Sequence, residues 1–172
     1  MGQPFFFNKN CVIGDQDYLY FRLQKAIARA KKIDLLVAFL MESGVRLLEN
    51  DLCQAVERGA VLRILCGNYL QITQPQALYL LKDLLGEKVD LRFYNQPQKA
   101  FHPKAYLFEN EQGGEIFVGS SNLSRTALTD GLEWNYRITA EKSPQDYHYF
   151  KQTFEELFLN HSIIINDQEL RR

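Results

Sequence analysis

Four polar side chains in the second half of the chain are spaced so that they could act together. His102 and Lys104 are two residues apart, and Ser120 and Asn122 repeat this spacing further along. Side chains two apart on a β-strand point to the same face. If the two segments are neighbouring strands, the sequence predicts one patch that holds an imidazole, an ammonium, a hydroxyl and a carboxamide.

This combination suits the chemistry of a phosphodiester. A lysine ammonium and the donors of serine and asparagine can stabilise charge that develops on the non-bridging phosphate oxygens. Histidine can act as the nucleophile or transfer a proton near neutral pH. No Asp and Glu cluster at metal-ligand spacing accompanies the four residues, so the sequence favours chemistry with no metal and no other cofactor. Each residue alone fits an ordinary structural role, but together they favour a functional site.

The segments before this patch are typical of an α/β domain. Apolar residues recur with helical periodicity in the amphipathic stretches, and short apolar runs between them fit buried strands. We expect Ser43 to cap the second helix and Gly59 to end it. The expected strands cover residues 33–40, 61–66 and 89–94, and the expected helices cover residues 17–32, 43–58 and 74–85.

The alternation of strand and helix stops after residue 94. Strands at 104–108 and 115–118 are expected to form a hairpin around a Gly113-Gly114 turn, and a strand at 134–139 precedes a last helix at 144–159. The pattern predicts an α/β fold with a mixed, largely parallel β-sheet flanked by helices on both faces. Because no linker or internal repeat interrupts it, we expect one domain over residues 1–172.

The composition narrows the class of protein. With 20 Lys+Arg against 21 Asp+Glu, the net charge of -1 lacks the basic footprint of many nucleic-acid binders, although it allows a local basic cleft. No apolar run approaches the roughly 20 residues of a membrane-spanning helix, so no membrane contact is expected. The scattered cysteines Cys11, Cys53 and Cys66 form neither a disulfide framework nor a metal motif. They indicate a reducing compartment, and a cytoplasmic location is expected.

The four polar residues also carry a family resemblance. The pattern His102-x-Lys104 followed by Gly119-Ser120-x-Asn122 resembles the HKD signature of the phospholipase D superfamily, His-x-Lys-x4-Asp-x6-Gly-Ser-x-Asn. More of the chain resembles one branch, the phospholipase D-like nuclease domains of certain restriction endonucleases and of DEAD/DEAH-box helicase-like proteins. The resembling stretches are residues 62–77, 101–108 and 117–136.

The resemblance implies a role for each matching residue. His102 would attack phosphorus and form a phosphohistidine, while Lys104, Ser120 and Asn122 would bind the phosphate oxygens. Single-motif nucleases of this kind also use a Glu eleven residues after the Asn, and Glu133 stands at that position, where it would orient the imidazole.

The sequence departs from the signature in two ways. Glu109 replaces the Asp of the signature, and nine residues rather than six separate it from Gly119. We read the extra residues as a longer hairpin turn that leaves the site intact. Glu109 is left outside the predicted catalytic set.

The resemblance also implies partners. Catalysis in the superfamily uses two facing motifs, and this chain has one, because neither His148 nor His161 is followed by a matching Lys. We therefore expect a symmetric homodimer whose two-fold axis passes through the active site. DNA is the expected substrate, and a helicase module, fused or associated, is a further expected partner.

Other residues near the motif have weaker indications. Lys99, Ser121 and Arg125 are predicted to contact the substrate, and Arg137 is a further candidate for the phosphate backbone. Cys66, Tyr69 and Trp134 are expected to pack in the core. Two alternative functions stay open: a non-catalytic module that binds nucleic acid or dimerises, and a phosphodiesterase acting on lipids.

Overall fold

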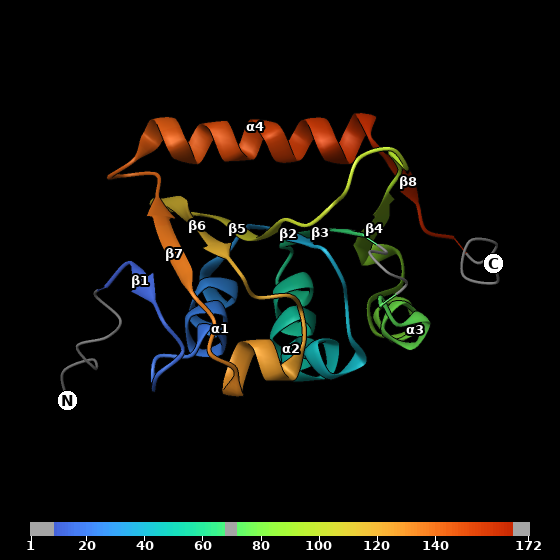
Figure 1. Cartoon of the computed structure of the whole chain (residues 1–172), viewed down its shortest axis with the longest axis horizontal. Coiled ribbons are helices and arrows are strands. Elements are labelled where there is room, and N and C mark those ends of the chain that lie inside the picture. The colour runs from blue at the N-terminus through green and yellow to red at the C-terminus, as the bar shows by residue number, and fades with distance from the viewer. Residues whose placement is uncertain (1–8, 68–71, 167–172) are drawn as a thin grey trace.

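The fold is an eight-stranded sheet with helices on both faces, seen in a computed structural model that describes residues 9–67 and 72–166 (Figure 1). Tyr69 and part of the resembling stretch at 62–77 lie outside these residues. The strand order is β1-β7-β6-β5-β2-β3-β4-β8. The strands are β1 (Cys11–Val12), β2 (Lys32–Val37), β3 (Val61–Cys66), β4 (Val89–Tyr94), β5 (Lys104–Asn110), β6 (Gly113–Gly119), β7 (Asn135–Thr139) and β8 (Ser162–Ile164).

The sheet is mixed, and its parallel part is smaller than the sequence predicted. Among the described strands, the only neighbours that pair parallel are β2 with β3 and β3 with β4. The other neighbours pair antiparallel, because the chain returns through hairpins after β5 and adds β1 and β8 at the two edges. The edge strands have two and three residues, too few for a strand periodicity to be recognised in the sequence.

Helices α1 (Leu19–Arg29), α2 (Glu42–Glu57) and α3 (Pro75–Leu85) pack below the sheet, and α4 (Pro144–Asn160) crosses above it (Figure 1). Each face of the sheet has its own apolar cluster. Strand β5 divides its side chains between them, because Tyr106 and Phe108 join the lower cluster while Ala105 and Leu107 join the upper one. The predicted helices on both faces are confirmed.

A buried ionic network fixes α4 on the sheet. Asp34 on β2 is 2% exposed and accepts hydrogen bonds from Arg63 Nε at 2.7 Å and from its Nη2 at 2.9 Å. The Arg63 guanidinium also pairs with Glu155 of α4 and lies 5.0 Å from the ring centre of Phe154. Burial alone would lower the pKa of Arg63, but hydrogen bonds and the charges of Asp34 and Glu155 raise it, so the guanidinium stays charged and can hold α4 in one position.

Two local predictions are corrected by the structure, and one element is new. Helix α2 begins after Met41 without a side-chain cap, and Ser43 Oγ instead accepts a hydrogen bond from Arg125 N at 3.1 Å. Gly113 and Gly114 are the first residues of β6, so the hairpin turn lies at residues 111–112. A π-helical turn, Thr126–Asp130, was not predicted.

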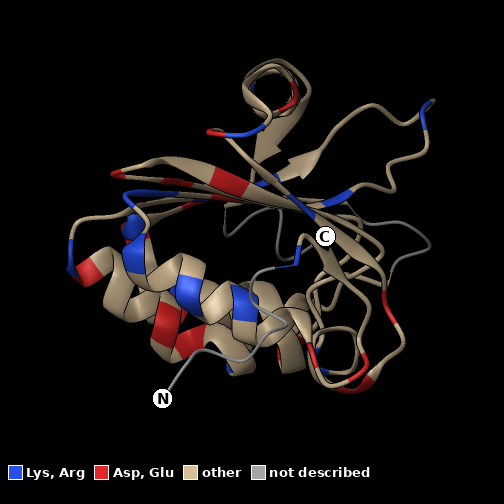
Figure 2. Ribbon diagram, turned by 90° about the vertical axis from the view of Figure 1, so that its left-hand side faces the viewer, with Lys and Arg blue, Asp and Glu red and all other residues tan. Residues whose placement is uncertain are grey.

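Helices α1 and α2 below the sheet differ in charge (Figure 2). Helix α1 carries Arg22, Lys25 and Arg29 and no acidic residue, whereas the charged residues of α2 are mostly acidic. Among the described residues, no helix is long and apolar enough to cross a membrane.

Candidate active site

Strand register brings the two motif segments to the same end of the sheet, where β5 begins and β6 ends. Ala105 at the start of β5 pairs with Val118 near the end of β6. The residues just before β5 therefore lie beside the residues just after β6. Lys104 also pairs with Val37, the last residue of β2, so the parallel strands end here too. Topology alone thus joins the two segments, as the sequence spacing predicted.

His102 and Lys104 are in direct contact. The Lys104 Nζ lies 2.7 Å from His102 Nδ1 and donates a hydrogen bond to the His102 carbonyl oxygen at 2.9 Å. His102 is exposed, whereas Lys104 is only 8% exposed. Burial lowers the pKa of Lys104, and the charge of Glu133 partly opposes this shift. A cation is therefore held under an accessible imidazole.

Ser120 and Glu133 form the second half of the site. The Ser120 hydroxyl donates a hydrogen bond to Glu133 Oε2 and accepts one from Trp134 N at 3.0 Å. The Ser120 amide donates to Trp134 O at 3.0 Å. The segment before β7 therefore fixes Ser120 at backbone and side chain. The imidazole-orienting role of Glu133 stays a prediction, since the carboxylate contact that the structure places here is to Ser120.

Asn122 is held from the side of β2. Its Oδ1 accepts a hydrogen bond from Phe39 N at 3.1 Å, and the side chain is 8% exposed. Because that oxygen is occupied, the amide nitrogen remains as the donor suited to a phosphate oxygen.

Two glycines, Gly119 and Gly44, stand where the backbone of another segment approaches too closely for a Cβ atom. A Cβ on Gly119 would lie 2.1 Å from Trp134 O, so the motif glycine lets β6 and β7 approach. A Cβ on Gly44 of α2 would lie 2.4 Å from the carbonyl of Leu123. Met41 N donates to Leu123 O at 3.0 Å in the same region. The start of α2 therefore supports the loop that carries Ser120 and Asn122.

Ser121 has a structural position that does not fit the predicted substrate contact. It is fully buried, and its Oγ accepts a hydrogen bond from Asn135 Nδ2 at 2.9 Å. Tyr106 OH donates to the Ser121 carbonyl at 2.9 Å, and burial raises the pKa of Tyr106, so its phenol stays protonated. Alternation could not reveal this, because the chain leaves strand geometry after Gly119.

Two residues that the sequence did not single out complete this support. Asn135 and Tyr106 lie beneath the loop on β7 and β5 and are both buried. Asn135 Oδ1 is the one buried side-chain nitrogen or oxygen of the described residues without a hydrogen-bond partner. A polar residue at an inward strand position was the available signal for Asn135.

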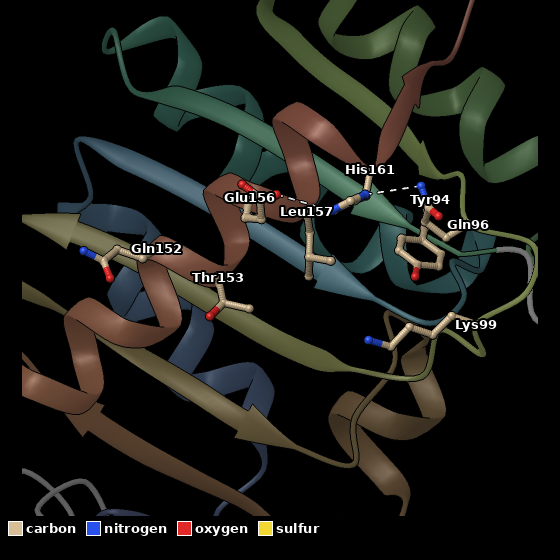
Figure 3. Close-up of a pocket in the computed structure, with 8 residues that line it drawn as sticks. All are labelled: Tyr94, Gln96, Lys99, Gln152, Thr153, Glu156, Leu157 and His161. Atoms are coloured by element: carbon tan, nitrogen blue, oxygen red, sulfur yellow. Dashed lines mark hydrogen bonds and ion pairs between the residues drawn. The ribbon is translucent and has the colours of Figure 1, made fainter.

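The residues predicted to contact the substrate from outside the motif, Lys99, Arg125 and Arg137, lie in three different places. Arg125 is exposed just after the loop. Lys99 lines a separate cavity of about 440 Å³ between the β4–β5 connection and α4 (Figure 3). In that cavity His161 lies 3.2 Å from Gln96 and 3.3 Å from Glu156. Arg137 Nε forms an ion pair with the buried Glu115 carboxylate at 2.6 Å. The charge of Arg137 is therefore balanced within the fold.

The remaining candidates are also placed by the structure. Glu109 lies toward the opposite end of β5 from His102 and pairs with Lys151 of α4. Cys66 is buried, as expected, whereas Trp134 is 71% exposed and does not pack in the core. Among the described residues, no group of three His, Cys, Asp or Glu side chains is placed to hold a metal ion.

Comparisons with known proteins identify the family and the fold. Residues 23–158, more than half of the chain, match the family model described as cardiolipin synthase, PLD-like domain. No curated protein matches the chain.

Three solved structures share the fold at low identity. The phospholipase D family member Nuc from Salmonella typhimurium has a TM-score of 0.70 and 17% identity over 91% of this chain and 97% of its own. Phosphatidylserine synthase from Haemophilus influenzae has a TM-score of 0.66 and 12% identity over 90% and 38%. NucT from Helicobacter pylori has a TM-score of 0.65 and 12% identity over 84% and 89%. The chain belongs to the family of phospholipase D-like domains.

Proposed function

We propose that this domain is a DNA phosphodiesterase, an endonuclease that works without a metal through a phosphohistidine on His102. The observation that carries the proposal is the contact of the exposed His102 imidazole with the buried Lys104 cation, at the end of the sheet where Ser120 and Asn122 follow β6. A nucleophile beside donors for phosphate oxygens is the arrangement that phosphoryl transfer requires.

The proposed reaction has two steps. A ring nitrogen of His102 attacks phosphorus, and the bond between phosphorus and the leaving oxygen breaks. The leaving oxygen takes a proton from His102 of a second copy. Water then attacks the phosphohistidine, its proton passes to that second imidazole, and the phosphorus–nitrogen bond breaks. Lys104, Ser120 and Asn122 stabilise the oxygens in both steps.

The second copy follows from the proton balance. One imidazole cannot hold phosphorus and at the same time protonate the leaving oxygen. The site that the chain supplies has a single motif histidine. We therefore propose a homodimer in which each chain gives His102, Lys104, Ser120, Asn122 and Glu133 to a shared site.

DNA is the proposed substrate because the three motif stretches resemble the nuclease branch. Exposed Arg125 adjoins the loop, and a phosphate contact there would make binding weaken with salt. Lys99, further away, would contact the same strand. We also propose that a helicase module, fused or associated, delivers the DNA, since the resembling domains accompany such modules.

A cleavage assay in excess EDTA tests the proposal. We expect the wild-type chain and the matched control His148→Ala, an exposed histidine on α4, to cut DNA. We expect His102→Ala to lose at least about 1,000-fold in rate, as removal of an essential nucleophile does. Cleavage that needs a divalent cation, or that survives in His102→Ala, would refute it. Turnover of phospholipid vesicles but not DNA would favour the lipid alternative.

A further inference from the structure

A cavity of about 440 Å³ lies next to the candidate site, between the β4–β5 connection and the C-terminal half of α4 (Figure 3). This volume is within the range of sites that hold a small molecule or one part of a larger ligand. Tyr94 gives the cavity an aromatic surface, and polar groups come from Gln96, Lys99, Glu156 and His161. The proposed chemistry at phosphorus uses none of these groups.

The strand register places the cavity at the same end of the sheet as the motif. Lys104 of β5 and Phe93 of β4 are connected across the sheet by the paired last residues of β2 and β3. Tyr94 follows as the last residue of β4. Its ring therefore lies at the end of the sheet where His102 precedes β5.

The ring of Phe101 connects Tyr94 to His102. The rings of Tyr94 and Phe101 stack with their centres 4.4 Å apart and their planes at 20°, and Phe101 directly precedes His102 in the chain. Phe101 is 8% exposed and packs so closely over Gly67 that a Cβ there would lie 2.6 Å from its Cδ1. A single fixed side chain thus separates the Tyr94 ring from the histidine residue.

Short contacts hold the two sides of the cavity together. Asn95 N donates a hydrogen bond to the His161 carbonyl oxygen at 2.8 Å, and Lys99 N donates one to the Gln96 carbonyl oxygen at 3.1 Å. His161 Nδ1 lies 3.2 Å from Gln96 Nε2, and its Nε2 lies 3.3 Å from Glu156 Oε1 (Figure 3). The β4–β5 connection is therefore fixed against the end of α4, and the chain forms the cavity by itself.

We infer that this cavity binds one base of the DNA strand whose phosphate His102 attacks, with the base stacked on Tyr94; the inference rests on the proposed function. Phe101 supports the Tyr94 ring, and the ring also lines the cavity, so it offers a surface on which a base can stack. Because a base inside a duplex is already stacked and paired, the base that enters comes from an unpaired nucleotide.

The chemistry of the lining favours a base over a phosphate or an acyl chain. Lys99 and Glu156 carry opposite charges, so the cavity has no excess of cations to hold an anion. The Gln96 amide and the His161 imidazole are hydrogen-bonding groups, and an acyl chain would leave them without partners. A flat ring with polar edges satisfies both the aromatic surface of Tyr94 and the polar groups around it.

Two oligonucleotides that differ only in their bases test the inference. One is a single strand of thymidines of about 12 nucleotides, and the other is an abasic strand of the same length, which keeps every phosphate. Fluorescence anisotropy in EDTA measures the affinity of the chain for each strand. All variants are made in the His102→Ala background, which is expected not to cut the strand.

The expected effect depends on the base. We expect Tyr94→Ala to bind the thymidine strand at least about 5-fold more weakly, as the loss of one stacked base does, and to bind the abasic strand as before. Tyr94→Phe keeps the ring and should retain both affinities. The control Tyr149→Ala removes a ring of α4 that is 72% exposed and lies outside the cavity lining, and it should change neither affinity. Circular dichroism confirms that each variant is folded.

The outcomes separate this inference from the proposed function. An equal loss of affinity for both strands in Tyr94→Ala would show that the ring only supports Phe101, and it would overturn the inference. Unchanged affinities in Tyr94→Ala, or no binding of either strand, would overturn it as well, while EDTA-resistant cleavage by the wild type would still support the proposed function. A loss confined to the thymidine strand supports the inference even if the wild type cuts no DNA, a result that would remove only the proposed chemistry.

Discussion

The Lys104 ammonium lies 2.7 Å from His102 Nδ1 and 2.9 Å from the carbonyl oxygen of the same residue. The cation is therefore fixed by backbone and side chain together, while its burial lowers its pKa. The proposed reaction needs Lys104 in its charged form, whereas burial makes that form less stable than it is in water.

This contact predicts an early alkaline limit to activity. The wild-type rate should fall at a pH below 10.5, the ordinary pKa of lysine, because Lys104 loses its proton early. Glu133→Gln should move this fall in rate to a still lower pH, because the Glu133 carboxylate opposes the downward shift of the Lys104 pKa. The arginine of Lys104→Arg stays charged throughout this range, so any residual activity should not show the alkaline fall in rate. Rate profiles from pH 6 to about 11 measure this, and a fall at higher pH in Glu133→Gln than in the wild type would contradict it.

The same burial has a consequence for stability. The folded-state pKa of Lys104 is lower than the unfolded one, so the unfolded chain binds more protons between the two values. Within that window the contribution of Lys104 to the free energy of unfolding should increase with pH. A comparison of the wild type with Lys104→Met by urea unfolding at pH 8 and about pH 10 isolates this contribution. An unchanged difference between the two pH values would count against it.

Asn135 should support the loop that carries Ser120 and Asn122. Its Nδ2 bond to Ser121 is buried, so Asn135→Ala should lower the free energy of unfolding by about 1–3 kcal/mol. It should also slow cleavage at temperatures where the variant is fully folded, because the Ser120 position loosens. The control is Asn160→Ala, whose amide makes an exposed hydrogen bond to Glu156 at 2.7 Å and should change stability by less than about 0.5 kcal/mol. Equal effects in both variants would contradict the positioning role.

Gly44 should be needed for the contact between α2 and the loop. Alanine favours a helix by up to about 1 kcal/mol over glycine, but its Cβ would meet the Leu123 carbonyl at 2.4 Å. We expect the clash to prevail, with a net loss of about 1–3 kcal/mol and reduced cleavage, because the loop must shift. Gln54→Ala, at an exposed position of the same helix, serves as the control. Thermal unfolding measures both, and a Gly44→Ala variant more stable than the wild type would disprove the close contact.

The cysteines should differ in reactivity. Burial raises the pKa of the Cys66 thiol to about 12, and the side chain is inaccessible, whereas Cys11 is exposed. Iodoacetamide at pH 8 should label Cys11 in the native chain and leave Cys66 unmodified until the protein unfolds. Peptide mass spectrometry reads both sites, and rapid native labelling of Cys66 would show that β3 opens.

The sequence specified the central elements well, because their signals are local. Strands β3 and β4 have the predicted boundaries of residues 61–66 and 89–94, since continuous apolar runs bounded by turns fit strands buried on both faces. The pairing of the two motif segments followed from the hairpin expected between residues 104–108 and 115–118, which the structure has as β5 and β6. The excess of antiparallel pairs was missed, because the direction of a strand depends on connections that periodicity does not encode.

The errors near the site have a common physical cause. Ser121 and Trp134 lie where the chain leaves regular strand geometry, so alternation does not fix which way they point. Ser121 is buried because Asn135 and Tyr106 offer it hydrogen bonds. Trp134 is 71% exposed although the large apolar area of its side chain favours burial.

Detection of a covalent intermediate on His102 tests the central claim most directly. A labelled DNA oligonucleotide is mixed with enzyme in EDTA, and the reaction is stopped within the first turnover at alkaline pH. We expect mass spectrometry to find a nucleotide fragment on the peptide that contains His102 in the wild type, and none in His102→Ala, which should not cut. Cleavage by His102→Ala at the wild-type rate, with no adduct on either protein, would contradict the account.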